Sequence, residues 1–122
     1  MNPLQKLDCD FTICKVKDMA QIDWTGKLVF LSKTEDEISL VCETAHAPVD
    51  AIAAEPGWKG LKVSGVLDFG MVGVIADIAG KLAGAGVSIF AVSTYDTDYF
   101  FVKAERFVKS VQVLAHNGYN IE

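Results

Sequence analysis

The sequence contains little of what catalysis and nucleic-acid binding most often need. It has two histidines, one arginine and a formal net charge of −5. Nucleic-acid phosphates are bound by clustered lysine and arginine, so we expect no nucleic-acid partner. There is no Gly-x-Ser-x-Gly elbow, no His-Glu-x-x-His motif and no Gly-x-x-x-x-Gly-Lys loop. We expect His46 and His116 to be solvated or to lie at a helix end. The sequence therefore predicts no enzyme, no catalytic residue and no cofactor.

Long hydrophobic runs and paired cysteines are also missing. No stretch approaches 18 uncharged apolar residues, so we expect no membrane span. Residues 1–6 lack the apolar core of a secretion signal, and a cytoplasmic protein is the default expectation. Cys9, Cys14 and Cys42 are odd in number, and no two have the spacing of a zinc knuckle. We expect reduced, mostly buried thiols and no metal site.

The sequence does contain a clear succession of predicted strands and helices, and it is clearest between Val63 and Val102. A chain of 122 residues can form one compact unit, or two small units that share a core. This segment predicts a strand, a glycine-containing turn, a helix and two further strands. In the helix, apolar residues at positions 74, 75, 78, 79, 82 and 83 recur at helical spacing, while Asp77, Lys81 and Gly84 should face water. Gly86 suits a left-handed stop after the helix, and residues 87–92 suit the following strand.

A second helix follows, and Asn117-Gly118 ends it. Residues 119–121 can form a short last strand. The order from Leu61 to Ile121 is therefore βαββαβ, which is the ferredoxin-like type of α+β fold. The apolar face of this second helix consists of Phe107, Val108, Val111, Leu114 and Ala115.

The first half of the chain is predicted to be a degenerate repeat of the strand and helix order of the second half. Residues 11–16, 28–31 and 38–42 predict strands. Pro48–Glu55 fits a short helix, and Pro56-Gly57 predicts a break in the chain. We therefore place a degenerate unit at residues 1–57 and a complete one at residues 58–122. Both halves need the strand at Leu61–Leu67, so we expect either pairing of the halves within the chain or a homodimer that covers the open edge.

Two stretches resemble a known family. Residues 73–89, GVIADIAGKLAGAGVSI, resemble the first half of an ACT domain, the small-ligand-sensing module of amino-acid metabolism. Residues 88–100, SIFAVSTYDTDYF, resemble aspartokinase-like proteins made of tandem ACT units, and the ACT units of the animal cytosolic arginine sensor. Val72 is a departure, since many ACT domains have the proline of a Pro-Gly turn there. The resemblance implies two ferredoxin-like units side by side, of which the N-terminal one is degenerate.

Two turns are candidates for a binding site. The turn at residues 68–73 precedes helix N–H groups that have no internal partner and suit a carboxylate, although its glycines could serve the turn alone. The turn at residues 93–98 places Asp96 and Asp98 two residues apart, although a plain hairpin has the same composition. The resemblance implies that both turns line an amino-acid site. The predicted ligand-binding residues are Asp68, Phe69, Gly70, Met71, Val72, Gly73, Ser93, Thr94, Tyr95, Thr97 and Asp98.

Together, these features predict a non-catalytic regulatory protein that binds a free amino acid between two ACT-like units. The alternative is an ACT-fold interaction module with no small-molecule ligand. A gain in stability on adding the ligand separates the two hypotheses. A separate question concerns Asp98, which is either a ligand contact or an exposed turn residue.

Overall fold

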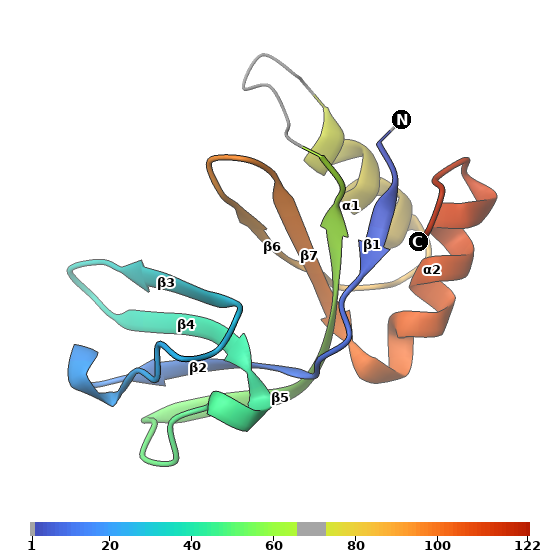
Figure 1. Cartoon of the computed structure of the whole chain (residues 1–122). Coiled ribbons are helices and arrows are strands. Elements are labelled where there is room, and N and C mark those ends of the chain that lie inside the picture. The colour runs from blue at the N-terminus through green and yellow to red at the C-terminus, as the bar shows by residue number, and fades with distance from the viewer. Residues whose placement is uncertain (1, 66–72) are drawn as a thin grey trace. The chain divides into compact units, whose positions relative to one another are not determined.

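A computed structural model describes residues 2–65 and 73–122, which form two compact units (Figure 1). The large unit contains Met1–Asp8 and Lys59–Glu122, and the small unit contains Cys9–Trp58. Residues 1–8, which the sequence analysis placed with residues 9–57, thus group with the second half of the chain.

The small unit is an antiparallel sheet with the strand order β3-β4-β2-β5. Two short 3₁₀ helices, η1 and η2, connect its strands. The three strands predicted between residues 11 and 42 are confirmed, with only small differences at their ends. The bounds are β2 Phe11–Val16, η1 Met19–Gln21, β3 Val29–Lys33, β4 Ile38–Glu43, η2 Thr44–His46 and β5 Ala53–Val63.

The core of the small unit lies on one face of this sheet. Alternate residues of β2 and β4 point to it, because successive side chains of a strand point to opposite faces. They pack with Ile22, which follows η1. The buried members of this core are Cys14, Val16, Ile22, Leu40 and Cys42.

The predicted helix at Pro48–Glu55 is wrong, because β5 begins at Ala53. Its first residues pair with β2, with Ala53 opposite Lys15 and Glu55 opposite Ile13. The backbone hydrogen bonds of this ladder outweigh the local helical pattern. The predicted break at Pro56-Gly57 is also wrong. These two residues lie within β5 where its register with β2 shifts, and the φ of 84° at Gly57 suits such a bulge.

The large unit has the strand order β1-β5-β7-β6, and helices α1 and α2 cover one face of its sheet (Figure 1). The predicted succession of strand, helix, two strands and helix is confirmed from β5 to α2. This is a mixed α+β fold with an antiparallel sheet. The remaining bounds are β1 Leu4–Lys6, α1 Val74–Gly84, β6 Phe90–Ser93, β7 Asp98–Lys103, η3 Ala104–Arg106 and α2 Phe107–His116.

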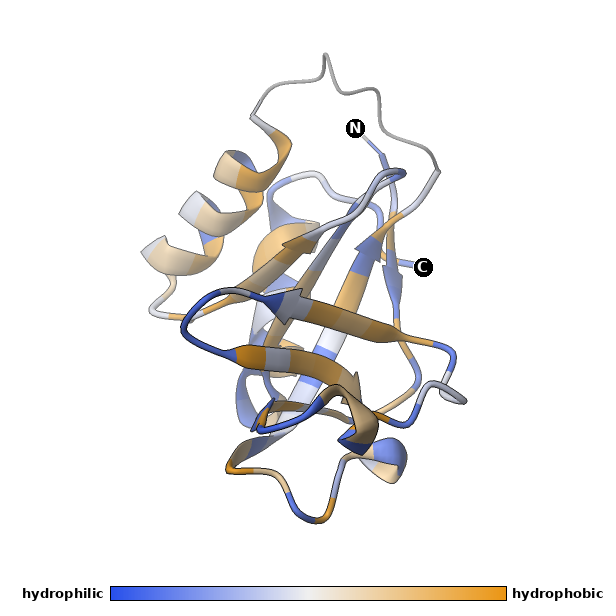
Figure 2. Ribbon diagram, turned by 90° about the vertical axis from the view of Figure 1, so that its left-hand side faces the viewer, coloured by the Kyte–Doolittle hydropathy of each residue, from blue (hydrophilic) through white to orange (hydrophobic). Residues whose placement is uncertain are grey.

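The helices bury their apolar faces against the large unit's sheet. Figure 2 shows the hydrophobic residues of α1 along one side of this helix. Ile78 and Leu82 of α1 are fully buried, and each contributes about 1.5–3 kcal/mol by leaving water. Leu114 of α2 is equally buried. The sheet side of this core consists of Leu4, Leu61, Val63, Phe100 and Val102. Within the described residues, neither helix has the length and apolarity that a membrane crossing requires.

Some details of the helices differ from the prediction. In α2, Val108 was predicted on the apolar face but is 69% exposed. Ser110 is buried instead. Its burial is tolerated because its hydroxyl donates a hydrogen bond to the backbone oxygen of Arg106 at 2.8 Å. Gly86 has a φ of 77° after α1, as predicted. The next strand, β6, starts only at Phe90, because Val87 still donates its N–H to Leu82 of α1.

The N-terminal strand β1 pairs with the second half of β5, with Leu4 opposite Val63 and Lys6 opposite Leu61. The predicted last strand at residues 119–121 is reduced to one parallel bridge between Ile121 and Leu4. The predicted strand at Leu61–Leu67 belongs to β5, which ends at Val63; residues 66 and 67 lie outside the described residues. One strand thus serves both units, because the boundary between them falls within β5.

Candidate ligand-binding site

The first turn of α1 has backbone N–H groups without a hydrogen-bond partner among the described residues. Gly73 is the N-cap residue, with a φ of 82°, and no side chain of the described residues caps the helix. The first N–H groups of a helix have no partner within it and carry partial positive charge, so they suit a small carboxylate. The other predicted residues of this turn, 68–72, lie outside the described residues.

The turn between β6 and β7 is closed by a pair of threonines. Thr94 donates its N–H and its hydroxyl to the backbone oxygen of Thr97, at 2.8 and 3.1 Å. Thr97 is buried, and its hydroxyl donates to the backbone oxygen of Val63 at 2.7 Å. Ser93 pairs with Asp98 in the ladder, and Tyr95 is 80% exposed. The hydroxyl of Thr97 therefore fixes the turn to the end of β5.

Asp98 is buried at the start of β7, with 9% of its surface exposed. Its carboxylate forms no hydrogen bond or ion pair with any residue in the ranges 2–65 and 73–122. Asp96 is exposed, so the two carboxylates do not share one environment. The sequence analysis offered an exposed turn residue as one interpretation of Asp98, and its burial contradicts that interpretation.

The start of α1 and the turn between β6 and β7 lie at the same end of the large unit (Figure 1). Thr97 binds the end of β5, and the chain then passes through residues 66–72 to Gly73. No hydrogen bond or ion pair among the described residues joins Gly73 directly to residues 93–98. The described part of the site is therefore a helix start and a buried carboxylate on neighbouring elements.

The sequence analysis missed a polar contact on α1. Asp77 accepts hydrogen bonds from Lys81 Nζ and from Tyr119 Oη, so Asp77 and Lys81 do not simply face water. The bonds from Lys81 and then Tyr119 lower the pKa of Asp77, and burial together with the Asp77 contact raises the pKa of Tyr119. The spacing of four residues could have revealed the Asp77–Lys81 pair. Nothing in the sequence links Tyr119 to it.

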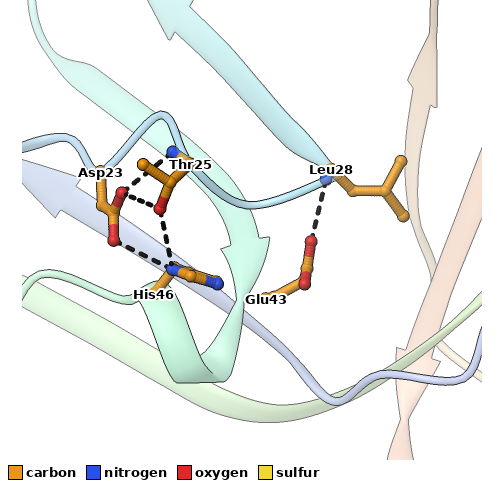
Figure 3. Close-up of polar contacts among 5 residues, drawn as sticks. All are labelled: Asp23, Thr25, Leu28, Glu43 and His46. Carbon is orange, nitrogen blue, oxygen red and sulfur yellow. Dashed lines mark hydrogen bonds and ion pairs between the residues drawn. The ribbon is translucent and has the colours of Figure 1, made fainter.

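A second polar cluster lies in the small unit (Figure 3). The Nδ1 atom of His46 is 2.9 Å from Asp23 Oδ2, and the hydroxyl of Thr25 donates to Asp23 Oδ1 at 2.6 Å. Glu43 Oε2 accepts the N–H of Leu28 at 2.9 Å. His46 and Glu43 pack closely on Gly26, since a Cβ atom there would lie 3.2 Å from His46 Cδ2 and 3.3 Å from Glu43 Oε2.

The contacts of this cluster indicate a structural role rather than a catalytic one. The same imidazole nitrogen faces both Asp23 and Thr25, so the arrangement does not relay a proton from the hydroxyl through the ring as a catalytic triad would. Among the described residues, no group of three His, Cys, Asp or Glu side chains could hold a metal ion. The cluster fixes the loop between η1 and β3 onto the segment from β4 to η2.

The cysteines form no disulfide and suit a core rather than a reactive site. Cys14 and Cys42 are buried and Cys9 is half-buried. Burial raises the pKa of the Cys14 thiol and raises that of Cys42 to about 12, so both stay protonated and poorly nucleophilic.

An open groove of about 720 Å³ lies elsewhere on the large unit, and none of the predicted site residues that the structure describes lines it. Its walls are charged and polar side chains, none of them buried. The lining residues are Gln5, Lys6, Asp8, Ser64 and Glu122.

Comparisons with known proteins agree with this architecture. The profile of the ACT domain family matches residues 53–116, which include β5, α1, β6, β7 and α2. None of the curated proteins searched matches the chain.

Three solved structures resemble the chain over nearly its whole length. A protein of Agrobacterium tumefaciens is 29% identical at a TM-score of 0.88, and the match covers 99% of this chain and 92% of that one. A protein of unknown function from Vibrio cholerae, described as a possible transport protein, is 21% identical at 0.69, with 93% and 88% covered. The regulatory subunit of aspartate kinase from Thermus thermophilus is 12% identical at 0.65, with 93% and 95% covered. The last two similarities show a shared fold.

Proposed function

The chain belongs to the ACT domain family, and on this basis we propose that it is a non-catalytic regulatory protein of the cytoplasm that binds a free amino acid. In this proposal the ligand lies at an interface between two ACT-like units. The large unit supplies one of them, and the small unit is a degenerate second one, as in tandem proteins of the aspartokinase type. A second copy of the chain covers the edge strand β6. The similarity to the aspartate kinase regulatory subunit supports a regulatory role.

The proposal rests on the burial of the Asp98 carboxylate. Asp98 is only 9% exposed, and its carboxylate, whose oxygens are not fully covered, has no partner within residues 2–65 and 73–122. Water therefore stabilises its charge less than that of an exposed carboxylate. A ligand ammonium or a cationic side chain would supply a partner. The uncapped start of α1 offers N–H donors at the same end of the unit, where the ligand's carboxylate fits. These two groups complement the two charges that every free amino acid carries.

A thermal-shift screen of the twenty standard amino acids tests this function. A ligand that binds only the folded chain adds about 2.7 kcal/mol to the free energy of unfolding at a hundred times its Kd, which is easily measured. We expect one amino acid, or a small chemical group of them, to raise the Tm. The acidic turns favour one with a cationic side chain. If no amino acid raises the Tm, the alternative of an ACT-fold interaction module without a ligand is the correct one.

The variant Asp98→Asn locates the ligand found by this screen. It keeps the shape of the side chain and removes its charge, so we expect the free protein to be at least as stable as the wild type. The complex should lose a charge-assisted hydrogen bond, about 1.5–3 kcal/mol of binding free energy by calorimetry. Asp96→Asn is the matched control, since Asp96 is exposed in the same turn. Unchanged affinity in Asp98→Asn would remove Asp98 from the site.

A further inference from the structure

The small unit carries exposed apolar side chains on two neighbouring loops. We call the four residues Met19, Trp24, Val49 and Ile52 the apolar patch. Trp24 and Ile52 are each more than half exposed, and Val49 is fully exposed. Single exposed apolar residues are common on soluble proteins, but a group of them on adjoining loops is a candidate surface for binding another molecule.

Hydrogen bonds hold these two loops together. Gln21 Nε2 donates to the backbone oxygen of Asp50 at 3.0 Å, which joins the loop of residues 17–25 to that of residues 47–52. His46 joins them again through Asp23, next to Trp24 (Figure 3). Within the first loop, Asp18 and Gln21 form a capping box around η1. The patch is therefore held in place before any partner arrives, which lowers the entropic cost of binding.

The charge around the patch identifies the chemistry of its partner. The small unit has nine Asp and Glu residues and four Lys residues, whereas the large unit has seven acidic and seven basic residues. The whole net charge of −5 thus belongs to the small unit. Along the two loops, three carboxylates accompany the patch and Lys17 is the only basic residue of residues 17–25 and 47–52. These carboxylates belong to Asp18, Asp23 and Asp50.

We propose that the apolar patch is a docking surface for a basic amphipathic segment of a partner protein. Such a segment places apolar side chains on the patch and lysine or arginine beside its carboxylates. The same charge disfavours the other occupants. A second copy would bring two acidic patches together in a twofold contact, and anionic lipid would be repelled. The proposal goes beyond amino-acid binding and does not depend on it.

Two synthetic peptides test the proposal with the full chain. Each is an amphipathic helix about 18 residues long, or five turns, with leucine on one face. The other face carries lysine in one peptide and glutamate in its twin. By calorimetry, we expect the lysine peptide to bind, the glutamate peptide not to bind, and binding to weaken as salt rises from about 50 to 200 mM.

Variants with serine separate this surface from general attraction to an acidic protein. We expect Trp24→Ser, and the double change Val49→Ser with Ile52→Ser, to weaken lysine-peptide binding about tenfold or more. Both variants keep every charge and should melt like the wild type, since these side chains are exposed. Val108→Ser removes an equally exposed side chain of the large unit and should bind like the wild type. The proposal is overturned if neither peptide binds, if both bind equally, or if the serine variants bind as well as the wild type.

Discussion

Asp23 accepts three hydrogen bonds although it lies in a loop at the surface. The Thr25 hydroxyl, the Thr25 N–H and His46 Nδ1 all lie within 3 Å of its carboxylate oxygens. The two bonds from Thr25 and then the one from His46 lower the pKa of Asp23 to about 2. Each of these bonds favours the charged form of the carboxylate, so the protonation state of Asp23 is linked to the folding of the loop.

The variant Asp23→Asn should reveal this linkage through pH. The folded pKa lies below the ordinary value of 3.8, so the stabilisation is present above about pH 4 and is lost as the pH falls toward 2. We expect the variant to melt below the wild type at pH 6, and the difference in Tm to shrink at pH 2.5. Asp50→Asn is the control, because no side-chain hydrogen bond of Asp50 is seen among the described residues. A difference that stays constant down to pH 2.5 would contradict the linkage.

At this scale the sequence reveals residues whose role is local and misses those with distant partners. The stop at Gly86 and the buried pair Ile78 and Leu82 follow from spacing alone. Asp98 was singled out from its turn, but its burial depends on how β7 packs in the sheet. The contact between Tyr119 and Asp77 joins residues 42 positions apart, and no local pattern contains that information.

Strand β6 lies at one end of the strand order, as β3 does at the other, so one side of its backbone is unpaired among the described strands. The order β1-β5-β7-β6 leaves it paired only with β7. Natural edge strands are usually protected by a charge or a proline, and Phe90–Ser93 contains neither. Phe90 is also 37% exposed. These features favour pairing of β6 with the β6 of a second copy.

Light scattering on the purified chain tests this pairing. We expect the mass of a homodimer, and a monomer for Ala91→Lys, which places a charge in the middle of the exposed edge. Val108→Lys adds the same charge on α2 and should remain a dimer. A wild type that stays monomeric at every concentration would rule out the dimer.

A helix or strand can be predicted from sequence when the residues that determine it lie within the element itself. Helix α1 buries a stripe that its own spacing defines, and its predicted start at Val74 is confirmed. Residues 48–55 also fit a short helix by their pattern, yet part of this segment becomes a strand because it pairs with β2. Strand pairing joins distant residues, so a pattern within one segment cannot decide it.

At the scale of the whole molecule, the N-terminal strand is the feature that the sequence did not reveal. The family and the order of elements from β5 to α2 were predictable, because they follow from residues adjacent in sequence. No strand was predicted within residues 1–8, although Leu4 is fully buried in the core of the large unit. A strand of three residues is too short to show a recognisable alternation of apolar and polar residues. It is identified only by its pairing with β5 and with Ile121.

The large unit should therefore fold alone only when it includes β1. Leu4 exchanges backbone hydrogen bonds with Asn120 and Glu122, and burying a leucine of this kind is worth about 2–5 kcal/mol against its replacement by alanine. That is a large part of the stability of a small domain, about 5–15 kcal/mol. We expect a fragment of residues 58–122 to be unfolded, or to unfold without a cooperative transition in urea.

A fusion of residues 1–8 to residues 59–122 provides the matched comparison. The strands β1 and β5 are antiparallel, and Leu7 donates its N–H to Gly60 at 3.0 Å, so a short hairpin turn can join Asp8 to Lys59. We expect this fusion to unfold cooperatively in urea, and Leu4→Ala within it to lose about 2–5 kcal/mol. If residues 58–122 unfold as cooperatively as the fusion, β1 is dispensable, and the boundary at residue 57 marks an independent domain. If the fusion also fails to fold, the large unit requires the small one, which contains the first half of β5 and the strand β2 that pairs with it.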